Sequence, residues 1–235
     1  MLSFRQLKPP DLSSVLEVQE IVRRHLADPT LYYSDDKEHF ARILDGAGAI
    51  FGAFYGDTLA GYGVVAFPGN AAENLGFDVP HLRIEPEAVA HLDGSGVRPE
   101  RRGLGIQRTL SEMRVRYAAD RGATDLLMTV APANYFSLRT HLNVGRFQAH
   151  GLKRKYGGLW RLVLHRPVSL PATAAPEASG WSALEDLEGH RRMLASGGFG
   201  FRVAYHDGVW RMAYAGLAAD GHGKAQQQLA ADERR

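Results

Sequence analysis

Residues 88–113 combine a predicted strand, a loop with two glycines and a predicted amphipathic helix, and this succession constrains the fold more than any other feature. Glycine lets backbone N–H groups approach a ligand closely, and a helix N-terminus favours phosphate because its first amides have no partner inside the helix. Arg101 and Arg102 stand directly before the glycines and can add charge-assisted hydrogen bonds. The stretch therefore predicts an α/β protein that binds a phosphorylated ligand at the start of a helix.

Three kinds of phosphate-binding loop compete for this stretch. A nucleotide P-loop needs Gly-Lys followed by Ser or Thr after its second glycine, and the sequence lacks this run. A dinucleotide fingerprint needs a third glycine, but Arg108 stands at that position. It also needs an early βαβ unit, whereas the strand here follows a β-α-α-β-β series. The third kind is an acyl-coenzyme A (acyl-CoA) loop.

The residues around the loop resemble a known signature. Residues 97–106, Val-Arg-Pro-Glu-Arg-Arg-Gly-Leu-Gly-Ile, resemble the Val-x-Pro-x-x-Arg-Gly-x-Gly-Ile-Gly pattern of the GCN5-related N-acetyltransferases, the GNAT superfamily. Residues 134–137, Asn-Tyr-Phe-Ser, and the later stretch from Gly145 to Phe147 resemble the second signature of that superfamily. The resemblance covers about the first seven-tenths of the chain. Three departures are Glu100, Gln107 where glycine or alanine is usual, and Arg146 as an insertion.

The resemblance implies a mixed α/β sheet, flanked by helices, that splays open between the strands at residues 88–97 and 125–131. Acetyl-CoA or a related acyl-CoA is the implied co-substrate, with its pantetheine arm in the opening and no metal. Gly94 and Gly96 agree, because glycine inside a strand often marks a bulge or a close approach of backbone. The residues that the resemblance assigns to the cofactor are Val97, Arg101, Arg102, Gly103, Leu104, Gly105, Ile106, Gln107, Asn134 and Ser137.

The implied reaction needs a base, because an alkylammonium group must lose a proton before it attacks a thioester. His91 and Asp93 are the candidates, and with Ser95 they alternate along the predicted strand, which would place all three on one side. The alternative is that they only form hydrogen bonds with neighbouring strands or loops. For protonation of the leaving thiolate the candidates are His141, Tyr135 and Tyr156.

Composition limits the other classes. A net charge of +2 over 235 residues makes no electrostatic case for nucleic acid or for an anionic membrane. The absence of cysteine excludes disulfides and thiolate nucleophiles, and no apolar run approaches the ~20 residues of a membrane span. The N-terminus reads as a strand rather than a signal peptide, so we expect a cytoplasmic protein. Arg101 and Arg102 are expected to touch the cofactor, whereas Arg108, Arg114 and Arg116 are expected to form a solvated helix face.

The predicted organisation is an acyltransferase domain at residues 1–168, a linker at 169–180, a small unit at 181–217 and a polar tail at 218–235. The small unit reads as a helix over residues 181–195 followed by a hairpin, and its aromatic residues make too much apolar surface to remain bare. We expect it to cover the main domain or to form a homodimer. The long segment at residues 68–87 is expected to be a solvated lid, although its acidic residues could instead select a cationic amine.

These features predict an N-acyltransferase that moves an acetyl or similar acyl group from acyl-CoA to a primary amine in a ternary complex. A small-molecule acceptor is favoured over a protein. The alternative is a non-catalytic acyl-CoA sensor or scaffold with the same fold.

Overall fold

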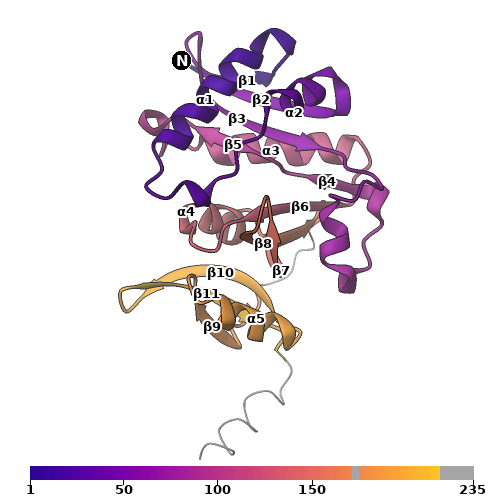
Figure 1. Ribbon diagram of the computed structural model, residues 1–235, viewed down its shortest axis with the longest axis vertical. Helices are drawn as coiled ribbons and strands as arrows, with labels where there is room; N and C mark the ends of the chain where they lie inside the picture. The colour runs from indigo at the N-terminus through magenta and orange to yellow at the C-terminus, as the bar shows by residue number, and fades with distance from the viewer. Residues whose placement is uncertain (171–174, 218–235) are drawn as a thin grey trace, which may run out of the picture.

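The computed structural model describes residues 1–170 and 175–217. The chain folds into a mixed sheet of eleven strands with helices on both faces (Figure 1). The helices are α1 (Leu12–Arg24), α2 (Lys37–Arg42), α3 (Ile106–Asp120), α4 (Tyr135–Leu138) and α5 (Leu187–Ala195). The strands are β1 (Leu2–Gln6), β2 (Gly48–Tyr55), β3 (Thr58–Ala66), β4 (Val89–His91), β5 (Ser95–Val97), β6 (Asp125–Val130), β7 (Gln148–Lys155), β8 (Leu159–Pro167), β9 (Gly180–Ala183), β10 (Phe199–His206) and β11 (Val209–Ala215). This architecture confirms the predicted α/β mixed-sheet class.

Local signals explain most of the first half of the chain. Strands β2 and β3 form a hairpin, and Gly56 in its turn has a φ of 62°, which glycine adopts without strain. Helix α1 begins directly after Asp11. Helix α2 begins after Asp36, whose carboxylate accepts a hydrogen bond from the His39 backbone N–H at 2.7 Å.

Each face of the sheet has its own apolar core. Helices α1 and α2 cover one face, where Val15, Val18 and Phe40 lie against Ile50 and Tyr62. Helix α3 covers the opposite face through a second cluster of buried residues that includes Ile106 and Leu110. Each fully buried side chain of this kind contributes about 1.5–3 kcal/mol. Helices α1 and α3 both contact β3 and β5, which form one edge of the sheet opening described next.

The predicted strand at residues 88–97 is interrupted, and the interruption opens the sheet. Strand β4 pairs in parallel with β6 as far as His91 and Leu127, whereas β5 pairs only with β3. Residues 92–94 form the bend between the two short strands. Beyond it, the last residues of β6 pair only with β8, on the other side. The sheet is therefore splayed at the place that the family resemblance implies.

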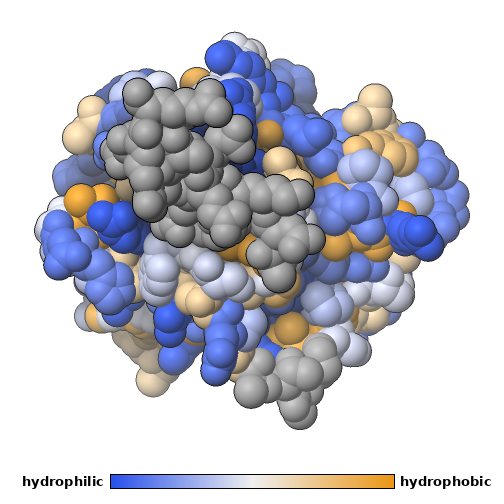
Figure 2. Space-filling view, turned by 90° about the horizontal axis from the view of Figure 1, so that it is seen from below, coloured by the Kyte–Doolittle hydropathy of each residue, from blue (hydrophilic) through white to orange (hydrophobic). Residues whose placement is uncertain are grey.

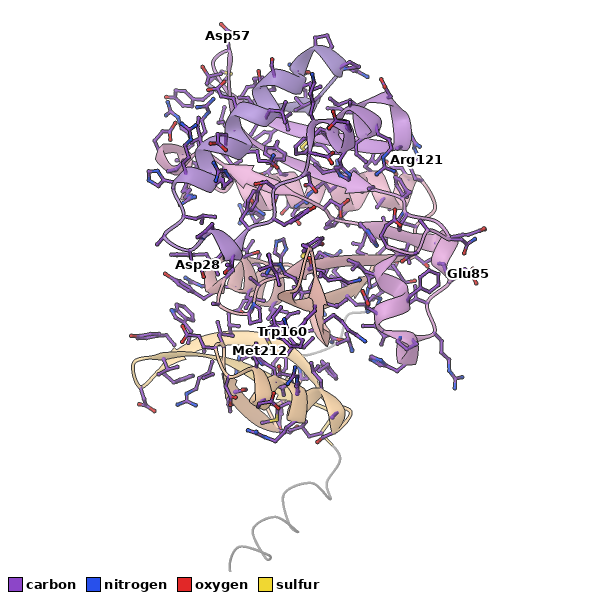
Figure 3. All side chains as sticks on the ribbon, in the orientation of Figure 1. Asp28, Asp57, Glu85, Arg121, Trp160 and Met212 are labelled. Carbon is purple, nitrogen blue, oxygen red and sulfur yellow. The ribbon has the colours of Figure 1, made fainter. Side chains whose placement is uncertain are left out.

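The segment at residues 68–87 is not the solvated lid expected from the sequence. It forms short 3-10 turns that pack on the sheet, with Leu75 and Val79 buried against Val163 of β8. The cavity described below is lined by no residue of this segment. Glu85 lies at the outer surface, on the opposite side of the molecule from Asp28 (Figure 3). The apolar residues of the segment fix its position because they complete this part of the core.

The C-terminal unit continues the main sheet. Strand β10 joins β7 at Gly200 and Ala149, and the order at this edge is β8-β7-β10-β11-β9 (Figure 1). The helix predicted over residues 181–195 is wrong in its first part, because Gly180–Ala183 is a strand that pairs with β11. The helix starts only after Asp186, whose carboxylate accepts from the Gly189 N–H at 2.8 Å. Residues 171–174 of the predicted linker and the whole predicted tail lie outside the described residues.

Aromatic contacts join the C-terminal unit to the rest of the chain. Tyr135 stacks on Trp210 of β11 with ring centroids 4.8 Å apart. Trp160 of β8 lies at the boundary between the two parts (Figure 3), and the Arg191 guanidinium lies over its ring at 4.5 Å. Figure 2 shows this end of the molecule as largely hydrophilic, with apolar residues in small separate groups outside the part hidden by grey atoms. Much of the aromatic surface is therefore buried within one chain, and the predicted homodimer stays a prediction.

We expect Trp210→Ala to lower the free energy of unfolding by about 2 kcal/mol, because it removes both buried ring area and a stacked pair. Tyr135→Phe is the matched control, since it keeps both rings and should leave stability within about 0.5 kcal/mol of the wild type. Denaturant unfolding measures both. An unchanged stability in Trp210→Ala would show that the contact does not hold the two parts together.

Candidate active site

A cavity of about 1020 Å³ occupies the opening of the sheet. Its walls come from the two diverging strands, the loop before α3, helix α4 and the segment at residues 31–35. The predicted cofactor residues all line it: Val97, Arg101, Arg102, Gly103, Leu104, Gly105, Ile106, Gln107, Asn134 and Ser137. The cavity thus joins residues that are far apart in the sequence into one continuous surface.

The glycine loop forms one end of the cavity. Gly103 and Gly105 have φ angles of 80° and 74°, and both positions have open space where a side chain would start. Glycine is needed there for the backbone angle rather than for close packing. Gly105 is the N-cap of α3 and supplies no side chain to the first amides of that helix. These amides are free to bond an anionic ligand.

The side chains beside the loop have different roles. The Arg101 guanidinium lies 3.9 Å from the centre of the Tyr55 ring, which holds it against the hairpin. Gln107, where glycine or alanine is usual, donates from Nε2 to Ser95 Oγ at 3.1 Å and ties the loop to β5. On the opposite wall, Asn134 Oδ1 accepts from the Ser137 N–H at 3.1 Å and so caps α4.

Asp93 lies on the bend between β4 and β5 and lines the cavity. Two histidines flank its carboxylate at 3.8 and 3.9 Å. His91 Nε2 accepts from the Leu75 N–H at 3.0 Å, so its proton is on Nδ1, which faces Asp93. His39 Nδ1 pairs with Arg42, which can only donate, so its proton is on Nε2, which also faces Asp93. Each ring therefore has an N–H that faces this carboxylate, at a distance longer than a hydrogen bond.

The expectation that His91, Asp93 and Ser95 face one side is wrong, because the bend breaks the alternation of the strand. Asp93 and Ser95 line the cavity, whereas His91 does not and is only 6 % exposed. Burial lowers the pKa of His91 to about 4 and keeps the ring neutral. His91 can orient Asp93, but the structure does not bring it to the cavity as a base.

Asp35 is a cavity residue that the sequence analysis missed. Gln19 holds its backbone with two hydrogen bonds, from Nε2 to Asp35 O at 2.8 Å and from Asp35 N to Oε1 at 3.0 Å. Gly94 leaves room for the carboxylate, because a Cβ there would lie 2.5 Å from Asp35 Oδ2. The residues next to Asp35 indicate only the start of α2, and the approach of Asp35 to Gly94 is a contact between distant parts of the chain.

Burial raises the pKa of Asp93 to about 6, and the nearby charge of Asp35 adds to this shift. Burial also raises the pKa of Asp35. Two carboxylates in one poorly hydrated place cannot both ionise easily, and a cation between them would favour the ionised forms. This end of the cavity is therefore suited to a positively charged group.

The three candidates for the proton donor are placed differently. Tyr156 lines the cavity, stacks on Tyr33 at 4.3 Å and shares a 2.9 Å hydrogen bond with Thr129 Oγ1. Burial raises its pKa, so the hydroxyl keeps its proton at neutral pH. His141 also lines the cavity, but burial lowers its pKa to about 3. Tyr135 does not line it and contacts Trp210 instead.

Arg114 was expected to lie on a solvated helix face, and this expectation is wrong. It is 1 % exposed and lines the cavity. Its spacing of four residues from Leu110 and eight from Ile106 placed it on the buried face of α3, and this was the missed signal. Gly63 of β3 makes the space, because a Cβ there would lie 2.9 Å from Arg114 Nε. Arg116, by contrast, is exposed as expected.

Comparisons with known proteins agree with this geometry. A model of the acetyltransferase (GNAT) family matches residues 16–145, and the chain belongs to this family. No curated protein matches the chain at a significant level.

Among the described residues, no helix is both long and apolar enough for a membrane crossing. Within the same ranges, no three His, Asp or Glu side chains are grouped to bind a metal.

Solved structures with the same fold include the ribosomal-protein-S18-alanine N-acetyltransferase of Escherichia coli, with a TM-score of 0.54, 16 % identity and coverage of 75 % of this chain and 100 % of that one. An N-acetyltransferase of Staphylococcus aureus has a TM-score of 0.55 and 16 % identity, covering 72 % and 99 %. The PaiA N-acetyltransferase of Thermoplasma acidophilum, in complex with coenzyme A, has a TM-score of 0.51 and 16 % identity, covering 71 % and 99 %. These neighbours are complete within the match, whereas about a quarter of this chain is not covered.

We expect Asp35→Asn to lower the pKa of Asp93, because it removes a negative charge that disfavours ionisation of the neighbouring carboxylate. Titration of the Asp93 carboxyl carbon by nuclear magnetic resonance measures this shift. Asp36→Asn is the control, because asparagine keeps the cap of α2 and Asp36 does not contribute to the shift. An unchanged pKa in Asp35→Asn would mean that the two carboxylates do not interact.

Proposed function

We propose that the protein transfers an acyl group, acetyl in the first instance, from acyl-CoA to a primary amine of a small molecule by direct attack. One observation carries this proposal: a single cavity connects the glycine loop before α3 with the carboxylates of Asp35 and Asp93. A polyanionic donor suits the first end, and a cationic acceptor suits the second. The sheet opening between them is where the two substrates would meet.

The loop residues 101–107 would hold the pyrophosphate of CoA through their backbone amides and the first amides of α3. Arg102 and Arg108, which line the same end, would add charge-assisted hydrogen bonds. The pantetheine arm would lie in the opening beside Val97 and Asn134, as the resemblance implies. Ser137 would contribute from the first turn of α4.

Asp93 is the proposed base. Its pKa of about 6 is closer to neutrality than that of an ordinary aspartate, which makes it a stronger base for an ammonium proton. Asp35 would hold the positive charge of the acceptor before the proton leaves. His39 and His91 would orient the Asp93 carboxylate through their N–H groups.

The reaction then follows from these positions. Asp93 takes one proton from the ammonium group, which frees the nitrogen lone pair to form a bond to the thioester carbon. The C–S bond then breaks, and the nitrogen loses its second proton to solvent. The leaving thiolate takes a proton from solvent or from Tyr156, which is protonated and lines the cavity. The stacked rings of Tyr33 and Tyr156 form part of the cavity wall, which would favour a small acceptor over a protein surface.

Isothermal titration with CoA, acetyl-CoA and NADH tests the donor side. We expect binding of both CoA forms, no binding of NADH, and loss of CoA binding in Gly105→Glu, which strains the loop and repels the pyrophosphate. Gly122→Glu is the matched control, because Gly122 has a similar φ of 82°, has open space around it and lies outside the cavity. Equal CoA binding in both variants would contradict the loop assignment.

A thiol-release assay with a panel of primary amines tests catalysis. We expect Asp93→Asn to lower kcat by about 10²- to 10⁴-fold, since it removes the base, while CoA affinity stays unchanged. The wild-type kcat/KM should fall as the pH drops through about 6, because protonated Asp93 cannot accept a proton, and Asp93→Asn should lose this dependence. CoA binding without release for any amine would favour a sensor of the same fold.

A further inference from the structure

The cavity wall contains a buried cation that the proposed reaction does not yet use. Arg114 reaches from the apolar face of α3 to the bend between β4 and β5. Its Nη1 donates to the backbone oxygens of Val64 and Asp93, each at 3.3 Å, and its Nε donates to Leu110 O at 3.3 Å. The guanidinium therefore lies beside the strand residue that carries the proposed base.

The other terminal nitrogen of Arg114 has no partner. Within residues 1–170 and 175–217, Nη2 is buried and forms no hydrogen bond. Burial lowers the pKa of Arg114 to about 10, so the group is still charged at neutral pH. A buried charged donor without an acceptor costs free energy, and native proteins rarely leave one.

The missing acceptor can come from the occupant of the cavity. The bend places Arg114 next to Asp93, and a base must lie within about 3 Å, or one water molecule, of the attacking amine. The thioester carbon lies one bond beyond that nitrogen in the transition state. Its oxygen is thus the nearest acceptor that the substrates would bring to this part of the wall, and it gains negative charge as the C–N bond forms.

We propose that Arg114 Nη2 donates to the thioester carbonyl oxygen and stabilises the negative charge that develops there. In this step the amine nitrogen adds to the carbon, the C=O electron pair moves to oxygen beside Arg114, and its return expels the thiolate. Asp93 holds the amine proton. This proposal rests on the proposed function and adds a catalytic residue on the donor side of the same site.

A purely structural role is the competing account, because the Nη1 bonds also support the bend. The two accounts differ in one binding property that needs no acceptor amine. An analogue in which CH₂ replaces the thioester sulfur keeps the carbonyl oxygen, whereas S-ethyl-CoA lacks it. Titration of the full-length protein with both analogues, and with CoA itself, isolates the contribution of that oxygen.

We expect the wild type to bind the ketone analogue about tenfold or more tightly than S-ethyl-CoA, as a hydrogen bond from a charged donor would give. Arg114→Gln should bring the ratio within about twofold while CoA affinity stays within about threefold, since glutamine can still donate to the carbonyls at the bend. Arg116→Met, an exposed position on the same helix, is the control and should keep the wild-type ratio. If Arg114→Gln does not bind CoA, the ratio of ketone-analogue to S-ethyl-CoA affinity is measured in Arg114→Lys instead, and the same criterion applies.

An equal ratio in the wild type and in the Arg114 variant would overturn the proposal. A selective loss of succinyl-CoA affinity with an unchanged ratio would also overturn it, because Arg114 would then bind a carboxylate on the acyl chain. With an active amine, kcat for acetyl transfer should fall about 10²- to 10³-fold in Arg114→Gln with little change in the acetyl-CoA KM. Absence of turnover with every amine contradicts the proposed function alone, since the binding ratio is measured without it.

Discussion

The separation of β5 from β6 is the constraint on which the rest of the structure depends. The two halves of the sheet remain joined as far as the hydrogen bond from Leu92 N to Leu127 O, at 2.9 Å. Beyond it, β5 is held only by β3, and the end of β6 only by β8. Backbone groups at such an opening need partners, and a ligand that runs between the strands can supply them. Helices α1 and α3 cover opposite faces of the half of the sheet that contains β3 and β5, and this fixes one edge of the opening.

Charge is distributed along this opening in an order that suits two substrates of opposite sign. The arginines near the glycine loop stand at one end, and the carboxylates of Asp35 and Asp93 stand at the other. Arg114 lies in the wall at the bend, beside the proposed base. Because Asp35, Asp93 and Arg114 are shielded from water, their charges act more strongly than they would on the surface. Separate groups within one cavity can therefore bind the donor and deprotonate the acceptor.

The sequence was sufficient for the parts that depend on local signals. The glycines before α3 predicted the start of that helix, and the cap at Asp36 and the turn at Gly56 are local signals of the same kind. The splayed sheet was predicted through the resemblance, supported by Gly94. All ten predicted cofactor residues lie along one cavity, and their contact with CoA stays a prediction.

The remaining features depend on contacts between distant residues. The choice between His91 and Asp93 turns on a bend of three residues, which strand periodicity cannot reveal. Asp35 reaches the cavity only because Gln19 and Gly94 fix its position from other elements. Strand β9 forms by pairing with β11, so its residues read as a helix when taken alone. The charge of Arg114 suggests a solvated helix face, whereas its spacing along α3 places it on the buried face.

A crystal structure of the protein with bound CoA tests the central claim most directly. The account predicts the pyrophosphate within hydrogen-bond distance of the backbone amides of residues 101–107, the pantetheine arm between β5 and β6, and the sulfur next to the bend that carries Asp93. Coenzyme A bound elsewhere on the molecule, or an opening that closes when CoA is added, would contradict the account.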